Sequence, residues 1–284
     1  MSERVLIVGA GNVGRGLYRA FRSSGIEVLG LHGRRSSAYT TSSGPLPADL
    51  GHANTIVVAV RDEDIDTAVG QLINSSTARN GISPGTVIIH TSGGAEPELI
   101  PRLPEFGLSG GTFHPMIPFA HSERVAALLK HAWIGIDGDD NARATSRRLA
   151  GHVGARTLEI PAGGKGIYHA AAVISSNFPV VLAEIASGLF MSLGVPERSA
   201  EQAVHGLMAG AVENLSEASP AEALTGPIAR GETQTLVHHL AALRGDPEAK
   251  AIYKRLSIAA LGMAARRGVD PATIEEMQKA LLLR

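Results

Sequence analysis

Cysteine is absent from the 284 residues of this chain. Its absence excludes disulfides, thiolate nucleophiles, iron–sulfur clusters and cysteine-type zinc sites. An excess of charge is also missing, because 26 basic and 27 acidic residues leave a net charge of −1. Without a basic excess to neutralise phosphates, the composition does not favour a partner made of nucleic acid.

Long apolar runs are scarce as well. We find no run of about 20 apolar residues without polar interruption, so the sequence predicts no membrane span. The N-terminal segment lacks the apolar stretch of a signal peptide, and we expect a cytoplasmic protein. The 11 histidines form no H-E-x-x-H string, and His238 and His239 are neighbours that face different sides of a predicted helix. No metal site is therefore expected.

The residues that are present describe an ordinary globular protein of two domains. Hydrophobic residues make up 44% of the chain and charged residues 19%. A single core stops growing at roughly 250–300 residues, which favours two domains over one.

Strands and helices alternate in the first part of the chain. Short apolar runs at residues 5–8, 26–31, 55–60, 86–90, 111–113, 133–136 and 157–160 predict buried strands. Helical spacing at residues 12–24, 64–73 and 141–153 fills the gaps, and residues 36–47 predict a surface loop. This pattern predicts an α/β domain with a doubly wound parallel sheet, a Rossmann fold, over residues 1–161.

The pattern changes after Pro161. Residues 165–193, 197–216, 233–243, 247–267 and 271–283 have helical apolar spacing, with glycine and proline between them. We therefore expect an all-α second domain over residues 162–284.

A glycine-rich string follows the first predicted strand. Gly9, Gly11 and Gly14 fit G-x-G-x-x-G, with Asn12 and Val13 opening the predicted helix. In this context Gly9 permits a tight turn, Gly11 lets the backbone approach a pyrophosphate, and Gly14 allows close packing of helix on strand. The helix N-terminus attracts the anion. The alternative is a glycine-rich turn without a ligand.

The end of the second predicted strand selects the cofactor. An NAD enzyme usually has an acid there, but this chain has Arg34, Arg35 and Ser36. Guanidinium groups suit a 2′-phosphate, so we expect NADP as the cofactor. A solvated basic turn is the alternative. Because ligands lie outside the carboxyl ends of the strands, further cofactor contacts are expected at Ala59, Val60, Arg61, Thr91 and Ser92.

Two clusters are candidates for chemistry. Lys165 begins the long helix, His169 shares its face, and Ser176 and Asn177 follow about three turns later. Lys165 is a candidate proton donor, Asn177 a candidate catalytic residue that binds substrate, and Ser92, His169 and Ser176 are candidates to line the substrate. The alternative for Lys165 is an aliphatic stem packed at a domain junction.

His114, at another predicted strand end, is the second candidate. A histidine there can meet substrate or nicotinamide, although a lone histidine is also often structural. The sequence does not decide whether Lys165 or His114 donates the proton. A third cluster at residues 225–231 is either a loop that reaches an active site or a turn between helices, and the turn is favoured.

Five segments together resemble a known family. They are the glycine string, HTSG at residues 90–93, FHPM at 113–116, KGIYHAAAVISSNF at 165–178 and LTGPIARGETQT at 224–235. They are similar to Rossmann-like oxidoreductases with a helical C-terminal domain of unknown function, within the group related to 6-phosphogluconate dehydrogenase and ketopantoate reductase. The resemblance covers nearly the whole chain.

The resemblance implies a catalytic lysine early in the linking helix, which Lys165 matches, and an asparagine one turn later, where this chain has His169. It also implies a serine–glycine–glycine substrate loop at residues 109–111 and a homodimer formed through the helical domain. The expected function is an NADPH-dependent reductase of a small 2-oxo acid, with ketopantoate first. The alternatives are an oxidoreductase similar to pyrroline-5-carboxylate reductase or prephenate dehydrogenase, and a non-catalytic NADP sensor.

Overall fold

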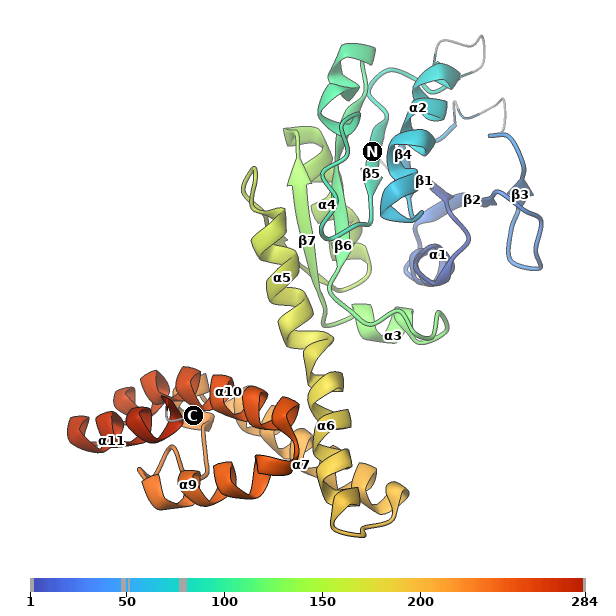
Figure 1. The fold of residues 1–284 in the computed structure, drawn as a ribbon. Coiled ribbons are helices and arrows are strands. Elements are labelled where there is room, and N and C mark those ends of the chain that lie inside the picture. The colour runs from blue at the N-terminus through green and yellow to red at the C-terminus, as the bar shows by residue number, and fades with distance from the viewer. Residues whose placement is uncertain (1–2, 47–49, 51, 77–80, 283–284) are drawn as a thin grey trace. The chain divides into compact units, whose positions relative to one another are not determined.

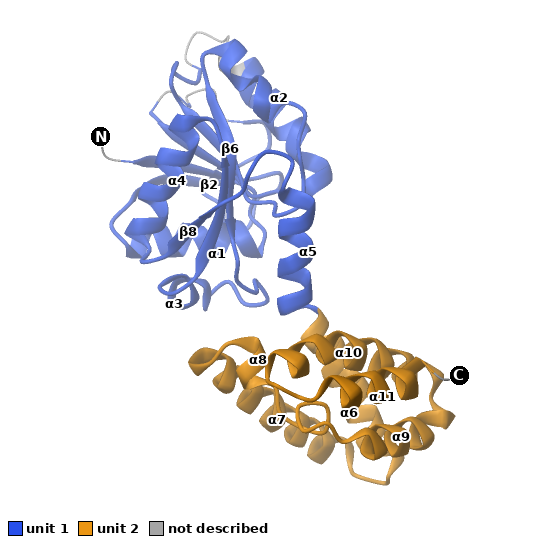
Figure 2. Cartoon of the chain, turned by 90° about the vertical axis from the view of Figure 1, so that its left-hand side faces the viewer, with its two compact units in different colours: residues 1–177 blue, residues 178–284 orange. Residues whose placement is uncertain are grey.

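The chain forms two compact units, Met1–Asn177 and Phe178–Arg284 (Figure 2). The computed structural model describes residues 3–46, 50, 52–76 and 81–282. Positions 47 and 283, which end two of the predicted segments, lie outside the described residues. Each unit is described by itself below.

The first unit is built on one sheet of eight strands in the order β3-β2-β1-β4-β5-β6-β7-β8 (Figure 1). Neighbouring strands are parallel except β6 and β7, which are antiparallel. The strands are β1 (Arg4–Val8), β2 (Glu27–Gly33), β3 (Ser42–Ser43), β4 (Thr55–Val58), β5 (Val87–His90), β6 (Ser109–Pro115), β7 (Trp133–Gly138) and β8 (Arg156–Glu159).

Helices cover both faces of the sheet because the central strands are apolar on both sides. On one face α1 (Asn12–Ser23), α3 (Val125–Leu129) and α4 (Asp140–His152) enclose a core in which Phe21 meets Phe113 edge to face at 6.0 Å. On the other face α2 (Ile65–Ser76) and the 3-10 helix η2 (Ile100–Phe106) cover Ile56 and Ile88. Each fully buried side chain of this kind contributes about 1.5–3 kcal/mol.

The doubly wound α/β fold with a helical second part, predicted from the sequence, is confirmed. The order of strands and helices in the first unit follows the predicted alternation. Six short elements were not predicted: β3, η1 (Asp62–Asp64), η2 and α3 in the first unit, and α8 (Pro220–Ala223) and η3 (Leu243–Gly245) in the second. They are two to seven residues long, too short to show a hydrophobic period.

The antiparallel step from β6 to β7 is a departure from a wholly parallel sheet. The connection runs through residues 116–132 and contains only the five-residue helix α3. Parallel strands need a crossover that returns the chain to the starting edge, usually through a longer helix. Here the chain turns back at the edge where β6 ends, so β7 enters in the opposite direction.

The division between the units comes later than the end of the last strand. The sequence placed the boundary after residue 161, where strands give way to helices; the compact units divide after Asn177. Helix α5 (Lys165–Ser176) belongs to the first unit because Lys165 and Tyr168 bond to strands β6 and β7 or their neighbours.

The second unit consists of helices with a small core. Its members are α6 (Phe178–Ser192), α7 (Glu197–Glu217), α8 (Pro220–Ala223), α9 (Thr233–Ala242), α10 (Pro247–Arg266) and α11 (Pro271–Leu282). Leu236, Leu261, Met277 and Leu281 form the buried cluster. These four side chains come from α9, α10 and α11, so α6 and α7 contribute nothing to that cluster.

One helical stretch in the described chain, Lys165–Ser192, is long and apolar enough to cross a membrane by length and composition alone. The sequence predicted no membrane span, because it contains no run of about 20 apolar residues without polar interruption. Lys165 is buried in the first unit, where it bonds to protein groups. In that first turn Lys165 is buried, whereas Gly166 and Ile167 are exposed.

Candidate active site

The glycine string forms the turn from β1 to α1. Gly9 has φ +116°, which a side chain rarely adopts, and an added Cβ would lie 2.2 Å from the carbonyl oxygen of Ala59. A Cβ on Gly14 would lie 1.8 Å from the carbonyl oxygen of Gly9. Glycine is therefore required at both positions by the fold itself.

Gly11 differs from these two glycines because nothing lies within 4 Å of its would-be Cβ. It is the N-cap of α1, and no side chain caps the free N–H groups there. The turn thus presents open space in front of uncapped backbone donors, which is the arrangement that accepts a pyrophosphate. Asn12 and Val13 follow in the first turn of α1, so the predicted cradle residues lie together.

Arg34, Arg35 and Ser36 follow β2 and are exposed, as the prediction of a 2′-phosphate site requires. Arg34 Nη2 lies 3.6 Å from Asp64 Oδ2. The strand end beneath them is held firmly, because the buried His32 ring lies 3.0 Å from Ser42 Oγ and 3.1 Å from the carbonyl oxygen of Gly44.

The remaining predicted cofactor residues lie at the carboxyl ends of β4 and β5. The Ala59 N–H donates to Val8, and Arg61 pairs with Glu63 and Asp64. Thr91 and Ser92 are buried, and Ser92 Oγ accepts from the N–H groups of Gly94 and Ala95. Val60 is the second residue after β4 and packs against the core that contains Ile56 and Ile88.

Lys165 is buried, only 5% exposed, and its ammonium is surrounded by acceptors. Its Nζ lies 2.6 Å from Thr112 Oγ1, 3.0 Å from the Ala95 carbonyl oxygen and 3.3 Å from Asp137 Oδ2. An ammonium has three N–H donors, so these three acceptors match all of them. The group joins the middle of β6 and the end of β7 to the loop after β5.

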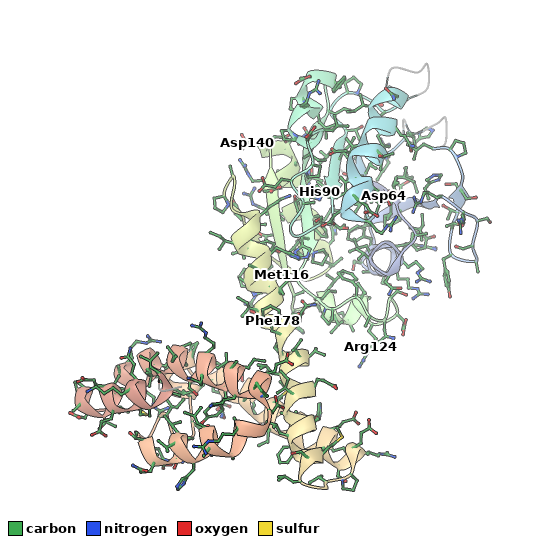
Figure 3. All side chains as sticks on the ribbon, in the orientation of Figure 1. Asp64, His90, Met116, Arg124, Asp140 and Phe178 are labelled. Carbon is green, nitrogen blue, oxygen red and sulfur yellow. The ribbon has the colours of Figure 1, made fainter. Side chains whose placement is uncertain are left out.

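His90 lies against this network at the centre of the first unit (Figure 3). Its Nε2 is 3.1 Å from Lys165 Nζ and 3.0 Å from Thr112 Oγ1, and its Nδ1 accepts from the N–H of Ser92. Burial, and then the charge of Lys165, lower the pKa of His90 from 6.5 to about 3. His90 is therefore neutral at neutral pH.

A second cluster lies one turn further along α5. Tyr168 Oη lies 2.6 Å from His114 Nδ1, and a backbone hydrogen bond joins Tyr168 to Gly135. An added Cβ at position 135 would lie 2.1 Å from the tyrosine oxygen, so a larger residue there would displace the phenol. If the Gly135 N–H donates to the phenol, the phenol donates to Nδ1, and Nε2 then carries the ring proton.

The free side of the His114 ring faces the loop after β5. A Cβ on Gly93 would lie 2.9 Å from His114 Nε2 and 2.7 Å from His169 Nδ1, and the two histidine rings are 6.0 Å apart. Burial is the largest cause that lowers the pKa of His114 to about 4, with help from His169 and Lys165. Burial raises the pKa of Tyr168 to about 12. At neutral pH the His114 ring is therefore neutral with one N–H, and the Tyr168 phenol keeps its proton, so each can donate one hydrogen bond.

Ser176 and Asn177 are not brought to these clusters. They are exposed at the far end of α5, about 18 Å along the helix from Lys165. The residues that sequence reasoning did not select are Tyr168, Thr112, Asp137 and Gly135. Tyr168 is one turn from Lys165, and that spacing was the available signal.

A cavity of about 480 Å³ is lined in part by Lys165. Ile100, Pro101, Ile160 and Lys165 are among its lining residues, whereas His114, Tyr168 and the glycine turn are not. Lys165 and His90 therefore line this cavity, and the His114–Tyr168 pair does not. Within the described part of the chain, no three histidine or acidic side chains gather in a way that could hold a metal ion.

Comparison with known proteins supports the architecture. Residues 132–260 match the model of a family described as a domain of unknown function, DUF2520. No curated protein matches.

Three solved structures give the fold. A protein from Thermotoga maritima is 23% identical, covering 92% of this chain and 98% of that chain, with a TM-score of 0.70. Pyrroline carboxylate reductase from Plasmodium falciparum, with NADP bound, is 13% identical over 98% of both chains, with a TM-score of 0.59. An imine reductase from Streptomyces aurantiacus is 16% identical over 98% of this chain and 93% of that chain, with a TM-score of 0.57.

These likenesses establish the fold of the chain. They confirm, at that level, the resemblance to Rossmann-like oxidoreductases that carry a helical C-terminal domain. Because one fold hosts many activities, the reaction has to be argued from the site.

Proposed function

We propose that this chain is an NADPH-dependent oxidoreductase that reduces a small carboxylate substrate bearing a carbonyl or imine carbon. The observation that carries the proposal is the pair His114 and Tyr168 at the end of β6, facing Gly93 at the end of β5. Both strand ends belong to the sheet edge that also carries the glycine turn. Ligands of doubly wound sheets lie at this edge.

The cofactor would be held by residues of the first unit and would supply a hydride when bound. The pyrophosphate would rest on the turn at α1, the 2′-phosphate on the groups after β2, and the nicotinamide side beside the ends of β4 and β5. The residues are Gly9, Gly11, Asn12, Val13, Gly14, Arg34, Arg35, Ser36, Ala59, Val60, Arg61, Thr91 and Ser92. The structural neighbours that are named for NADP or NAD support this assignment.

His114 and Tyr168 would handle the proton. His114 Nε2–H donates a hydrogen bond to the oxygen or nitrogen on which charge develops. As the Nε2 proton moves to that atom, the Tyr168 proton moves to Nδ1, and the N–H of Gly135 stabilises the phenolate left behind. The Nδ1 proton then returns to Tyr168 while solvent supplies a proton to Nε2, which restores the starting tautomer of His114. This assignment moves the predicted proton donor from Lys165, whose donors are matched by protein acceptors, to His114.

Two substrate classes remain within the proposal. A 2-oxo acid, with ketopantoate as the leading compound, needs the proton relay because an alkoxide develops. A cyclic imine such as pyrroline-5-carboxylate already carries its proton when it reacts as an iminium ion. A neutral His114 does not repel that cation, and the neighbours named as pyrroline carboxylate and imine reductases favour this second class. His169 would line the substrate next to Gly93, with Ser92.

The test is the loss of NADPH absorbance with a panel of 2-oxo acids and cyclic imines, led by ketopantoate, with NADH in parallel. Oxidation of NADPH that exceeds oxidation of NADH supports the proposal, and the substrate that reacts fastest selects the class. Binding of NADPH without turnover of any panel member would contradict an enzymatic role and support the sensor.

We also propose that the protein is a cytoplasmic homodimer joined through α6 and α7. Apolar side chains of these helices are exposed, among them Phe178, Val180, Val181, Leu207, Val212 and Leu215. Exposed large apolar side chains on two helices that pack against each other are typical of an interface. Light scattering should give twice the chain mass for the wild type and the chain mass for Leu207→Glu. Leu256→Glu, at an exposed leucine of α10, is the control and should stay dimeric.

A further inference from the structure

Arginines gather around the glycine turn without carboxylates to match them. Arg15 and Arg19 lie on α1, and Arg34 and Arg35 follow β2. Of these four, only Arg34 has an ion pair within the described residues, to Asp64 at 3.6 Å. The chain as a whole carries no basic excess, so this local excess is a property of the turn.

Arg15 occupies an unfavourable position for a cation. The first turn of α1 contains no acidic residue, and the helix dipole places partial positive charge there. Arg15 is half-buried and bends back toward that end, donating from Nη2 to Asn12 Oδ1 at 2.6 Å and from Nε to the Gly11 carbonyl oxygen at 3.4 Å. Arg19 lies four residues on, so the two like charges also repel each other.

The ring of Tyr39 contacts both Arg15 and Arg19. It lies 4.8 Å from Arg15 Cζ and 5.8 Å from Arg19 Cζ, as in a cation–π contact. Tyr39 belongs to the segment that carries Arg34, Arg35 and Ser36 from β2 to β3. The far end of that segment is anchored at Thr41, whose N–H donates to Leu31 and whose Oγ1 accepts from the N–H of Leu31.

We propose that Arg15 is a third arginine of the subsite for the ribose 2′-phosphate, and that Tyr39 positions it there. The inference rests on the proposed function. A phosphate monoester brings a charge of about −1.5 to −2 at neutral pH, which offsets the repulsion among the arginines. Its oxygens accept paired N–H donors from guanidinium groups. Arg15 would reach the 2′-phosphate from α1, while Arg34 and Arg35 reach it from the end of β2.

The test measures dissociation constants of NADPH and NADH by titration calorimetry, with NADH by competition where it binds weakly. Arg15→Gln should weaken NADPH roughly tenfold, which is about 1.4 kcal/mol, and leave NADH within roughly twofold. Arg22→Gln is the matched control. Arg22 is on the same helix and also lies over a tyrosine, Tyr18, at 5.5 Å, but in the last turn, so both constants should be unchanged.

A second pair of variants tests the role of the ring. Tyr39→Phe keeps the cation–π contact and should bind NADPH as the wild type does, whereas Tyr39→Leu should weaken NADPH roughly threefold and spare NADH. Equal losses for both cofactors in Arg15→Gln, or no loss for NADPH, would overturn the inference and leave the proposed function intact. A wild-type protein that binds neither cofactor would overturn both.

Discussion

Two polar clusters lie one helical turn apart on α5, and they differ in how completely the protein satisfies them. The first is Lys165 with Thr112, Asp137 and the Ala95 carbonyl oxygen, where every donor of the ammonium has an acceptor. The second is Tyr168 with His114. The His114 Nδ1 is hydrogen-bonded to Tyr168, and within the described part of the chain no residue forms a hydrogen bond with Nε2.

This difference suggests a structural role for the first cluster and a catalytic role for the second. A buried charge is tolerated only when it is paired and hydrogen-bonded, and such a network fixes the elements that it joins. A donor that stays free beside a ligand-binding edge is available to a substrate. Of the two residues that the sequence offered as proton donor, the geometry therefore favours His114 for the chemistry and gives Lys165 the task of holding the loop after β5.

The largest expected effect comes from breaking the first cluster. Lys165→Met leaves the half-buried Asp137 carboxylate without its ion-pair partner and removes the bonds to Thr112 and the Ala95 carbonyl oxygen, and should reduce the free energy of unfolding by about 3–5 kcal/mol, measured by urea denaturation. Lys279→Met, which removes a surface ion pair with Glu275, should change it by less than about 1 kcal/mol. A stable Lys165→Met protein that has lost turnover would instead make Lys165 the catalytic acid.

Breaking the second cluster should affect turnover far more than stability. His114→Ala removes the donor to the developing charge and should lower kcat by about 10²–10⁴-fold, with the dissociation constant of NADPH unchanged. Steady-state kinetics and calorimetry on the same sample check this. A variant that keeps wild-type kcat would contradict the role of Nε2.

Tyr168→Phe tests the second cluster more finely. It removes the hydroxyl that orients His114 and passes it a proton, but it keeps the aromatic ring. We expect a fall in kcat of roughly tenfold for a carbonyl substrate and a smaller fall for an imine, which needs the relay less. The pH profile of kcat should shift as the pKa of His114 rises. Tyr18→Phe, on α1, should leave both rate and profile unchanged.

The pH dependence of stability gives the smallest effect. The folded pKa values of His90 and His114 are about 3 and about 4, below the ordinary 6.5. The unfolded chain therefore binds more protons between about pH 6.5 and pH 3, so stability is complete above pH 6.5 and falls as the pH drops through this window. Each histidine contributes a slope of up to about 1.4 kcal/mol per pH unit.

Urea midpoints at pH 7, 6 and 5 check this slope. His114→Gln should reduce the slope, whereas His121→Gln, at an exposed histidine outside both clusters, should preserve it. An unchanged slope in His114→Gln would mean that His114 does not stay neutral in the folded protein.

Periodic and glycine patterns made most of the first unit predictable. The sequence predicted His114, Ser92 and Arg34 at the carboxyl edge of the sheet, because each follows or ends a predicted strand and the carboxyl ends of parallel strands share an edge. The change from strands to helices after Pro161 was also visible, since it is a change of hydrophobic period.

Tertiary pairing was not predictable from one sequence. Nothing in the spacing of α5 tells that Lys165 meets Asp137, or that Gly135 makes room for Tyr168, because those contacts join α5 to β7. The same holds for Asn177. Helical spacing put it about three turns from Lys165, and only the position of α5 on the sheet shows that it is remote from the histidines.

The most direct test of the account is a single turnover of bound NADPH with the best panel substrate, compared between wild type and His114→Ala. The account predicts hydride transfer in the wild type, and a rate at least about a hundredfold lower in the variant with equal NADPH occupancy. Equal rates, or no transfer by a wild-type protein saturated with NADPH, would contradict it.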